Sequence, residues 1–344
     1  MQYEVTIGIP VYNVESFIRS TLESALAQTF KSIEFLVVDD CSTDSSMKIV
    51  QEYQASHRRG SDIHILCQQQ NLGVSKARNR IIDEAQGRFL FFMDSDDCIE
   101  PDTISLLMEH QQRVDADIII GSSDKIETYN NNRVVEIIKY PQCDLLGEDK
   151  LASYAFRQYG ALQTNIWNFC VDINVLRRSG LRFVDINYWE DMVFMFDLVT
   201  YCNRAVLIPQ ITYHYLCRYE SLSNYQQREQ IKKDEILRIV FAVNIMKQKS
   251  MRLKLKSYYP QCHYCVMMTS FYVVCNIIKN RGKIIPDVSS SELKQIMKSN
   301  ESFLGIMSFE KHMVKNLCLY SIGLFPSSLM TIIVYLIGKI KRLV

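Results

Sequence analysis

Residues 89–97 read FLFFMDSDD, so five apolar residues lead directly into a turn that carries three aspartates. A short apolar run rich in aromatic side chains is typical of a buried strand. Carboxylates beside an apolar core are costly unless water, a cation or hydrogen-bond donors satisfy them. The stretch therefore predicts a buried strand, Phe89–Met93, that ends in a polar site.

Strand-like runs of this kind alternate with helical patterns over residues 1 to about 125. Besides the run above, the expected strands are Val5–Val11, Phe35–Val38, Ile63–Leu66 and Ile118–Ile120. Between them, apolar residues recur at helical spacing. Such alternation predicts right-handed crossovers and a mainly parallel sheet with helices on both faces, and such sheets bind ligands at the carboxyl ends of their strands.

The rest of the chain is expected to form two further parts. Residues 126–226 have a less regular pattern and are interpreted as an α+β extension of the first part, whereas residues 227–344 are mostly helical by pattern and end in an apolar stretch. With 48% hydrophobic and 22% charged residues, the 344-residue chain is not a disordered or low-complexity protein. Its net charge of +1 gives no electrostatic reason to expect a nucleic-acid partner.

Polar residues follow three of the expected strands, as Tyr12-Asn13, Asp39-Asp40 and Asp94-Ser95-Asp96-Asp97. These groups should therefore meet at one edge of the sheet. Because Mg²⁺ and Mn²⁺ prefer oxygen ligands, one hypothesis is that the acidic turn holds a divalent cation. The alternative is a solvated loop whose aspartates cap the helix that begins at Pro101.

Five motifs, in this order, resemble the family 2 glycosyltransferases, which have the GT-A fold. They are IPVYN at 9–13, VVDDCSTD at 37–44, NLGVSKARN at 71–79, FMDSDD at 92–97 and WEDMVF at 189–194. The resemblance implies an α/β nucleotide-sugar-binding domain with a Rossmann-like, mainly parallel sheet. Residues 1–125 would form its nucleotide-sugar-binding half and residues 126–226 its acceptor-side half, followed by the helical C-terminal region, 227–344.

On the donor side, the resemblance implies that Tyr12 stacks on the base of a nucleotide sugar and that Pro10 shapes the turn beneath it. Asp40 would accept the base N3–H, which favours a UDP-sugar, and Asp39 would support the same turn. The remaining implied contacts line the nucleotide pocket or close over the diphosphate, and they are Asn71, Arg78, Arg218 and Ser221. An ordinary salt bridge is the alternative for Arg78.

In the acidic turn, the resemblance implies that Asp96 is the main protein ligand of Mn²⁺ or Mg²⁺. Asp94 would contact the ribose or the metal shell, and Asp97 would orient either one. His214 is a further candidate ligand, although a histidine between two tyrosines is more often packed or hydrogen-bonded.

The resemblance also implies an inverting reaction, in which an acceptor hydroxyl attacks the anomeric carbon directly. Asp191 is the candidate base, and Glu190 is its orienting neighbour or an acceptor contact. The alternative is an acidic pair that stabilises a helix N-terminus. Many relatives have glycine where this chain has Trp189, so the acceptor side of the pocket is expected to differ, and a sugar could stack on the indole.

Other functions fit the motifs less well. A nucleotidyltransferase would need a basic glycine-rich segment after the first strand, where this chain has IPVYN. A catalytically inactive, membrane-associated assembly partner stays open, and turnover of a nucleotide sugar would separate it from an enzyme. The acceptor is expected to be a glycan or a lipid-linked saccharide in cell-surface polysaccharide synthesis.

The C-terminal stretch suggests peripheral contact with a membrane. Residues 311–344 contain five lysines and arginines and no acidic residue. The uncharged residues 316–338 are divided by Pro326, which predicts two interfacial helices rather than one span. The alternative is a pair of core-packing helices. The N-terminus lacks a secretory signal, so a cytoplasmic protein at the inner face of the cell membrane is expected.

Overall fold

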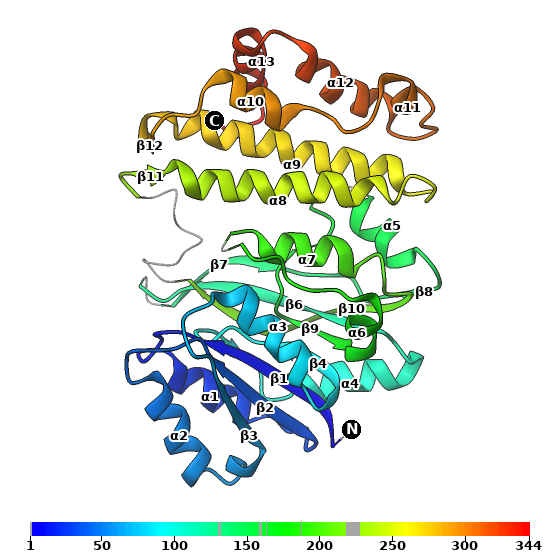
Figure 1. The fold of residues 1–344 in the computed structure, drawn as a ribbon. Helices are drawn as coiled ribbons and strands as arrows, with labels where there is room; N and C mark the ends of the chain where they lie inside the picture. The colour runs from blue at the N-terminus through cyan, green and yellow to red at the C-terminus, as the bar shows by residue number, and fades with distance from the viewer. Residues whose placement is uncertain (1, 130–131, 158–159, 163, 187, 218–227) are drawn as a thin grey trace. The chain divides into compact units, whose positions relative to one another are not determined.

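The computed structural model describes residues 2–129, 132–157, 160–162, 164–186, 188–217 and 228–344 (Figure 1). The chain forms two compact units. The first comprises Met1–Leu151 and Thr164–Glu220, and the second comprises Ala152–Gln163 and Ser221–Val344.

The first unit begins with alternating strands and helices, as the sequence pattern predicts. The elements up to residue 127 are β1 (Tyr3–Val11), α1 (Ile18–Leu26), β2 (Ile33–Asp39), α2 (Ser46–Ser56), β3 (Ile63–Cys67), α3 (Val74–Glu84), β4 (Gly87–Phe92), β5 (Cys98–Ile99), α4 (Thr103–Val114) and β6 (Ile118–Glu127). The later elements are β7 (Arg133–Ile138), β8 (Cys143–Leu146), α5 (Lys150–Phe156, which ends in the second unit), β9 (Phe169–Asp172), α6 (Ile173–Ser179), α7 (Glu190–Leu198) and β10 (Arg204–Cys217).

One sheet organises this unit, with the described strands in the order β3-β2-β1-β4-β9-β6-β10-β5. Strands β3, β2, β1 and β4 pair in parallel, as do β6 and β10. Because β9 pairs antiparallel with both β4 and β6, these two groups run in the same direction. β7 pairs with β6, and β8 pairs with β10, both antiparallel. The predicted α/β fold with a mainly parallel sheet is confirmed.

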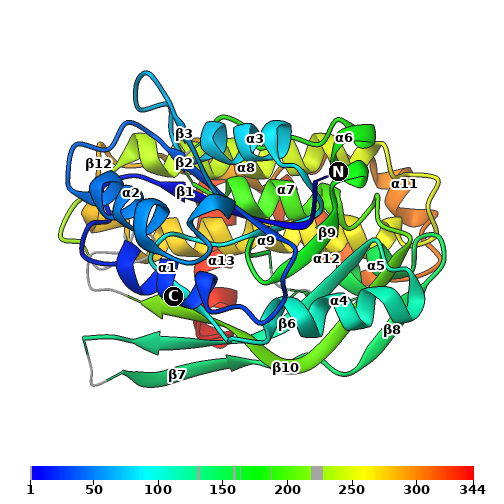
Figure 2. The same cartoon turned by 90° about the horizontal axis from the view of Figure 1, so that it is seen from below.

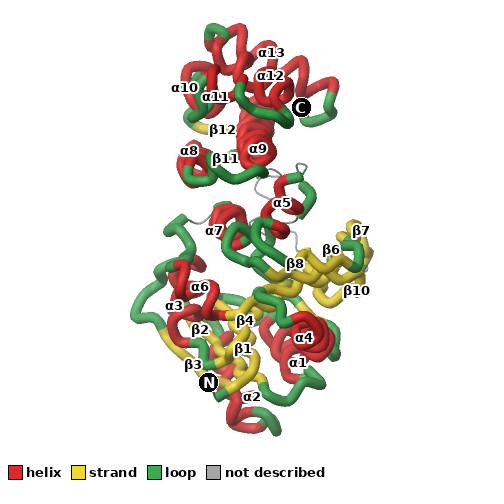
Figure 3. The backbone as a smooth tube through the Cα atoms, turned by 90° about the vertical axis from the view of Figure 1, so that its right-hand side faces the viewer, coloured by secondary structure: helices red, strands yellow, loops and turns green. Residues whose placement is uncertain are grey.

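Helices cover both faces of this sheet, with α3 and α6 on one side and α1 and α4 on the other (Figures 2 and 3). The main core lies between the sheet and α1 and α4, where Ile7 and Ile9 of β1 are fully buried with Leu22. On the opposite face, α3 lies close above β1. A Cβ at Gly8 would be 2.4 Å from Cγ2 of Ile81, so only glycine leaves room for this helix.

Helices dominate the second unit. Its elements after residue 230 are β11 (Ile231–Lys232), α8 (Lys233–Met251), α9 (Tyr259–Lys279), β12 (Ile284–Ile285), α10 (Ser290–Met297), α11 (Phe303–Met307), α12 (Met313–Leu324) and α13 (Ser327–Ile340). The central helix is α9, because α8, α10, α12 and α13 all pack against it. Its buried residues, Val266, Phe271 and Val274 among them, lie on more than one face, as expected of a helix surrounded by others. Among the described helices, none has the length and apolar content needed to cross a bilayer.

Candidate functional site

The ends of β1, β2 and β3 lie side by side at one edge of the sheet. In the parallel registers, Val11 is opposite Asp39, and Asp39 is opposite Cys67. Pro10 is the penultimate residue of β1. The Gly8 carbonyl accepts a hydrogen bond from the Met93 amide, and the ladder of hydrogen bonds between β1 and β4 ends there. Proline has no N–H, and at this position no ladder hydrogen bond requires one.

The two loops that follow β1 and β2 are tied to each other. Asn13, at φ 50°, accepts a 2.8 Å hydrogen bond on Oδ1 from the Thr43 amide and donates its own amide to Ser42 Oγ at 3.2 Å. Asp39 Oδ1 accepts from the Ser42 amide at 2.9 Å. Beside these loops, Tyr12 is 47% exposed. A fixed backbone thus presents an exposed aromatic ring at the carboxyl edge, where the family resemblance implies base stacking.

Asp40 is buried and fastens the loop that precedes α3. Its Oδ1 accepts from the Leu72 amide at 2.7 Å and from Gln68 Nε2 at 2.5 Å, and its Oδ2 accepts from the Gly73 amide at 2.8 Å. Asn71 lies in this loop with an exposed side chain. The second aspartate of the motif therefore positions the segment that carries Asn71.

Arg78 of α3 lies buried between two carboxylates that are far apart in the sequence. Its Nη2 donates to Asp94 Oδ1 at 2.9 Å, and its Nη1 donates to Glu190 Oε1 at 2.8 Å. The guanidinium carbon lies 5.5 Å from the ring centroid of Phe183. The side chain is only 6% exposed. The arginine thus joins the acidic turn to the Glu-Asp motif through buried ion pairs, where the sequence left an ordinary salt bridge as the alternative.

The three aspartates of the acidic turn have different environments. Asp97 is fully buried and accepts from the Tyr213 hydroxyl at 2.8 Å and from the Leu216 amide at 2.8 Å. Burial, and then the charge of Asp94, raises the pKa of Asp97 well above its usual range. Asp94 and Asp96 are partly exposed. Asp97 therefore connects the turn to β10, whereas Asp94 and Asp96 lie where a ligand can reach them.

Tyr213 is a residue whose part in the site sequence reasoning missed. Its hydroxyl also accepts a hydrogen bond from the Asp94 amide at 3.1 Å, and its ring stacks on Trp167 with centroids 4.4 Å apart. The available signal was the position of Tyr213 in a strand-like run, where it and Thr212 are buried and His214 and Tyr215 are partly exposed. Residues 213–217, which lead to the expected diphosphate contacts Arg218 and Ser221, form the end of β10, paired with β6. Arg218 and Ser221 lie outside the described residues.

His214 lies between two carboxylates. Its Nδ1 is 2.7 Å from Asp124 Oδ1, and its Nε2 is 3.0 Å from Glu100 Oε1. Both ring nitrogens therefore have partners within the first unit. Among the described residues, no group of three or more histidines, cysteines, aspartates or glutamates has an arrangement that could hold a metal ion.

Glu190 and Asp191 begin α7, directly after Trp189 in the left-handed conformation at φ 63°. Glycine adopts this positive φ without steric cost, which explains why many relatives have glycine before the acidic pair. Asp191 Oδ1 accepts from the Met192 amide at 2.7 Å. Burial, and then the charge of Glu190, raises the pKa of Asp191 to about 7, although Arg78 acts in the opposite direction.

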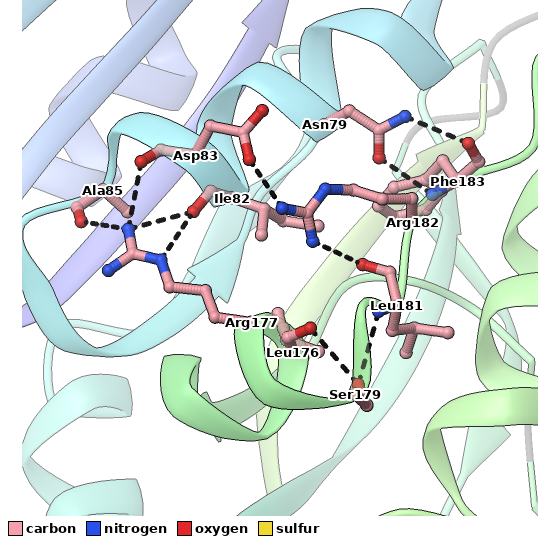
Figure 4. A network of polar contacts seen from close by, with 10 residues as sticks. All are labelled: Asn79, Ile82, Asp83, Ala85, Leu176, Arg177, Ser179, Leu181, Arg182 and Phe183. Atoms are coloured by element: carbon pink, nitrogen blue, oxygen red, sulfur yellow. Dashed lines mark hydrogen bonds and ion pairs between the residues drawn. The ribbon is translucent and has the colours of Figure 1, made fainter.

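A polar network fixes the segment before α7 along α3 (Figure 4). Asn79 donates from Nδ2 to the Phe183 carbonyl at 3.0 Å and accepts on Oδ1 from the Phe183 amide at 2.8 Å. Arg182 pairs with Asp83 at 2.7 Å. Arg177 donates to the carbonyls of Ile82, Asp83 and Ala85 at the end of α3.

The network continues toward the acidic pair. Ser75 Oγ donates to the Ile186 carbonyl at 3.0 Å, one turn of α3 before Asn79. Phe183 also stacks on Phe194 of α7, with centroids 4.0 Å apart. Asn79 belongs to the motif at 71–79, yet nothing in the sequence indicated its partner. The same helix therefore holds Arg78 and the chain segment that delivers Glu190 and Asp191.

Comparison with known proteins gives one family. A model described as glycosyl transferase family 2 matches residues 6–184. The chain is 24% identical to the succinoglycan biosynthesis protein ExoO of Rhizobium meliloti, over 74% of each chain. It covers only 16% to 64% of the length of three curated relatives that match more strongly.

Two solved structures resemble the chain in fold. TarS of S. aureus, in complex with UDP-GlcNAc, has a TM-score of 0.57 at 18% identity and covers 93% of this chain and 90% of its own. The mannosyltransferase PcManGT of Pyrobaculum calidifontis, with GDP-Man and Mn²⁺, has a TM-score of 0.54 at 14% identity and covers 98% and 88%. With these likenesses, the GT-A fold expected from the motifs is confirmed.

The bridge made by Arg78 gives a stability prediction. Arg78→Met replaces the guanidinium by an apolar, unbranched side chain. Asp94 and Glu190 then lose their cation. Breaking a buried ion pair in this way costs about 3–5 kcal/mol, and we expect the lower end because Asp94 is partly exposed. Urea unfolding of the purified protein measures the loss.

Lys76→Met is the matched control for this variant. Lys76 is on the same helix and pairs with Asp185 at 3.3 Å, but both side chains are exposed. Such pairs contribute about 0–1 kcal/mol. Equal free energies of unfolding for the two variants would show that the Arg78 bridge is no stronger than a surface pair.

Proposed function

We propose, because the chain belongs to glycosyl transferase family 2, that it is an inverting glycosyltransferase that uses a UDP-sugar. Its acceptor is a glycan or lipid-linked saccharide hydroxyl in polysaccharide synthesis. A peripheral position at the inner face of the cell membrane is part of the proposal, since lipid-linked acceptors are found there. The observation that carries the proposal is the Arg78 bridge, which holds the acidic turn and the Glu190-Asp191 pair in one site.

The proposed base site lies at the ends of β1 and β2. The exposed ring of Tyr12 offers a stacking surface, and the backbone of both loops is fixed by Asn13, Ser42 and Thr43. A carboxylate has about four lone-pair sites, and Asp40 uses three of them on the loop at 68–73. The fourth is what remains for a base N3–H, which is the contact that favours uracil. TarS in complex with UDP-GlcNAc supports this choice, whereas PcManGT binds GDP-Man.

The acidic turn fits a divalent cation in the chemistry of its donors. Asp94 and Asp96 present carboxylate oxygens in a partly exposed position, and Mn²⁺ or Mg²⁺ usually takes one or two carboxylates together with substrate phosphate oxygens. Asp96 would hold the ion, with Asp94 beside it. A bound ion would neutralise the charge that develops on the leaving diphosphate. Neither Asp97, which faces β10, nor His214, which has two carboxylate partners, is needed for this role.

In the proposed reaction, the acceptor oxygen bonds to the anomeric carbon as the bond from that carbon to the diphosphate oxygen breaks. Asp191 takes the hydroxyl proton during the attack. Because the acceptor attacks the anomeric carbon directly, no covalent intermediate with the protein forms. Its pKa near 7 places it between the ionised and neutral forms at physiological pH, the range in which a base works well. Arg78 holds Glu190, so the neighbour that raises this pKa stays fixed.

Trp189 is the proposed contact for the acceptor sugar. It directly precedes Glu190 and Asp191, and its indole is partly exposed. A non-glycine residue at φ 63° is held there against its conformational preference, which is common where a side chain has a function. An indole face is well suited to stack on the apolar face of a sugar ring.

The donor assignment predicts nucleotide selectivity. UDP should bind more tightly than GDP or CMP in the presence of Mn²⁺, and chelator should weaken UDP binding because the diphosphate then lacks its counter-ion. Tyr12→Ala should weaken UDP about five- to a hundredfold, the usual scale of base stacking on an aromatic ring. Calorimetry measures all three effects. Equal affinity for UDP and GDP, or an affinity for UDP that Tyr12→Ala leaves unchanged, would show that the base does not bind at this site.

The base assignment predicts a pH dependence with a definite sign. Asp191 must be ionised to accept a proton, so transfer should fall about tenfold per pH unit below about 7 and level off above it. Asp191→Asn should reduce transfer by about two to four powers of ten while UDP still binds. Asp185→Asn, an exposed carboxylate six residues earlier, is the control and should keep the wild-type profile. A wild-type rate in Asp191→Asn would exclude it as the base.

The acceptor assignment predicts an effect confined to the acceptor. Trp189→Gly keeps the left-handed backbone and removes the ring, so KM for a saccharide acceptor should rise about five- to tenfold, the scale of about 1–1.5 kcal/mol for an aromatic contact. Trp189→Phe should restore part of the loss. Hydrolysis of the UDP-sugar without acceptor should not change. Equal effects on hydrolysis and transfer would instead show that the indole supports the donor site.

A further inference from the structure

Helix α13 has two apolar faces, and only one of them is used inside the second unit. Met330, Val334 and Gly338 are buried, and a Cβ at Gly338 would be 3.1 Å from Cys275 Sγ of α9. On the opposite face, Ile332 is 55% exposed, Leu336 54% and Ile340 83%. Core packing therefore explains half of this helix and leaves the other half without a partner in the described part of the chain.

Further apolar side chains are exposed on α13 and at the end of α12. Leu329 begins the exposed face on α13, with the spacing of three, four and four residues that keeps Leu329, Ile332, Leu336 and Ile340 on one side of a helix. Leu324 and Phe325, at the end of α12, are also exposed. The two helices contact each other and lie together on one side of α9 (Figure 1). We call these six residues the α12–α13 face.

The charged residues within 311–344 all have one sign. Residues 311–344 contain Lys311, Lys315, Lys339, Lys341 and Arg342 and no acidic residue, and all five basic residues are exposed. Lys339 lies with its ammonium 4.8 Å from the Tyr335 ring centroid, along the helix that carries the apolar residues. A long basic side chain beside exposed aliphatic groups can reach lipid headgroups while its stem stays on apolar surface.

We infer that the α12–α13 face binds the surface of a bilayer that contains anionic lipid, with α13 lying in the interface. The 14 residues of α13 rise about 21 Å, less than the roughly 30 Å of a hydrocarbon core, so the helix lies on the membrane instead of crossing it. The inference rests on the proposed function in one respect: membrane binding would bring the enzyme to a lipid-linked acceptor. The bilayer binding itself follows from the apolar residues and the charge.

The basic charge argues against a second copy of the chain on this face. In a two-fold contact the same surface meets itself, so Lys339, Lys341 and Arg342, at and just after the end of α13, would approach their own copies, and residues 311–344 supply no acidic residue to compensate. An anionic lipid surface has the opposite charge and covers the apolar residues at the same time.

Vesicle flotation of the full 344-residue chain tests the inference. The probes are vesicles of phosphatidylcholine alone and of phosphatidylcholine with about one third phosphatidylglycerol, the anionic share being large enough to bind basic patches. We expect the protein to float with the anionic vesicles, to bind the neutral ones at least tenfold more weakly, and to be released by high salt. Protein that stays at the bottom of the gradient with both compositions would overturn the inference.

Variants separate the face from general stickiness. Ile332→Glu/Leu336→Glu places charge on exposed positions and should reduce binding to anionic vesicles at least tenfold. Leu237→Glu/Phe241→Glu is the matched control, since both residues are exposed on α8 of the same unit, and should bind as the wild type does. Equal binding by the two double variants would overturn the inference. The inference would also be overturned if the wild-type protein were a dimer that did not bind vesicles and Ile332→Glu/Leu336→Glu converted it to a monomer.

Calorimetry with UDP on the same samples distinguishes failure of this inference from failure of the proposed function. UDP binding without vesicle binding would refute the membrane surface alone. Vesicle binding without UDP binding would refute the UDP-sugar donor of the proposed function and leave the α12–α13 face in place.

Discussion

The candidate site depends on one buried cation. Arg78 is almost wholly enclosed, yet it contacts two carboxylates, Asp94 after β4 and Glu190 at the start of α7. Each of these three charges would be costly inside the protein if it were alone, and together they are stable because each one compensates for another. The position of α3 over the sheet therefore determines where both acidic motifs lie. That position is possible because Gly8 leaves room for Ile81.

This arrangement gives two kinds of work to the motif at 71–79. Its first part forms a loop that Asp40 fastens through two backbone amides, and its last part is a helix that holds the chain before α7. A change at Asn79 or Ser75 would therefore act on Glu190 and Asp191, although neither residue needs to touch a substrate. Some residues of the family motifs in this chain therefore position other parts of the protein and need not contact a ligand.

The helical unit follows a different constraint. A central helix, α9, is buried by its neighbours, and the outermost of these, α13, must have one apolar face to pack against it. Nothing in that packing requires a second apolar face on α13. The exposed Ile332 and Leu336, in a stretch without acidic residues, are therefore best explained by a surface outside the unit.

The sequence by itself determined the α/β alternation, the burial of Phe89–Met93 and the meeting of the strand ends at one edge, because these depend on periodicity and on the direction of parallel strands. Only the tertiary structure decided the partners of the charged groups. Arg78 meets Glu190 across 112 positions, and Asp97 meets Tyr213 across 116. Local patterns specify which face of an element is apolar, but the choice among several carboxylates for one arginine depends on which helix packs over which strand, and that is settled only when the whole core assembles.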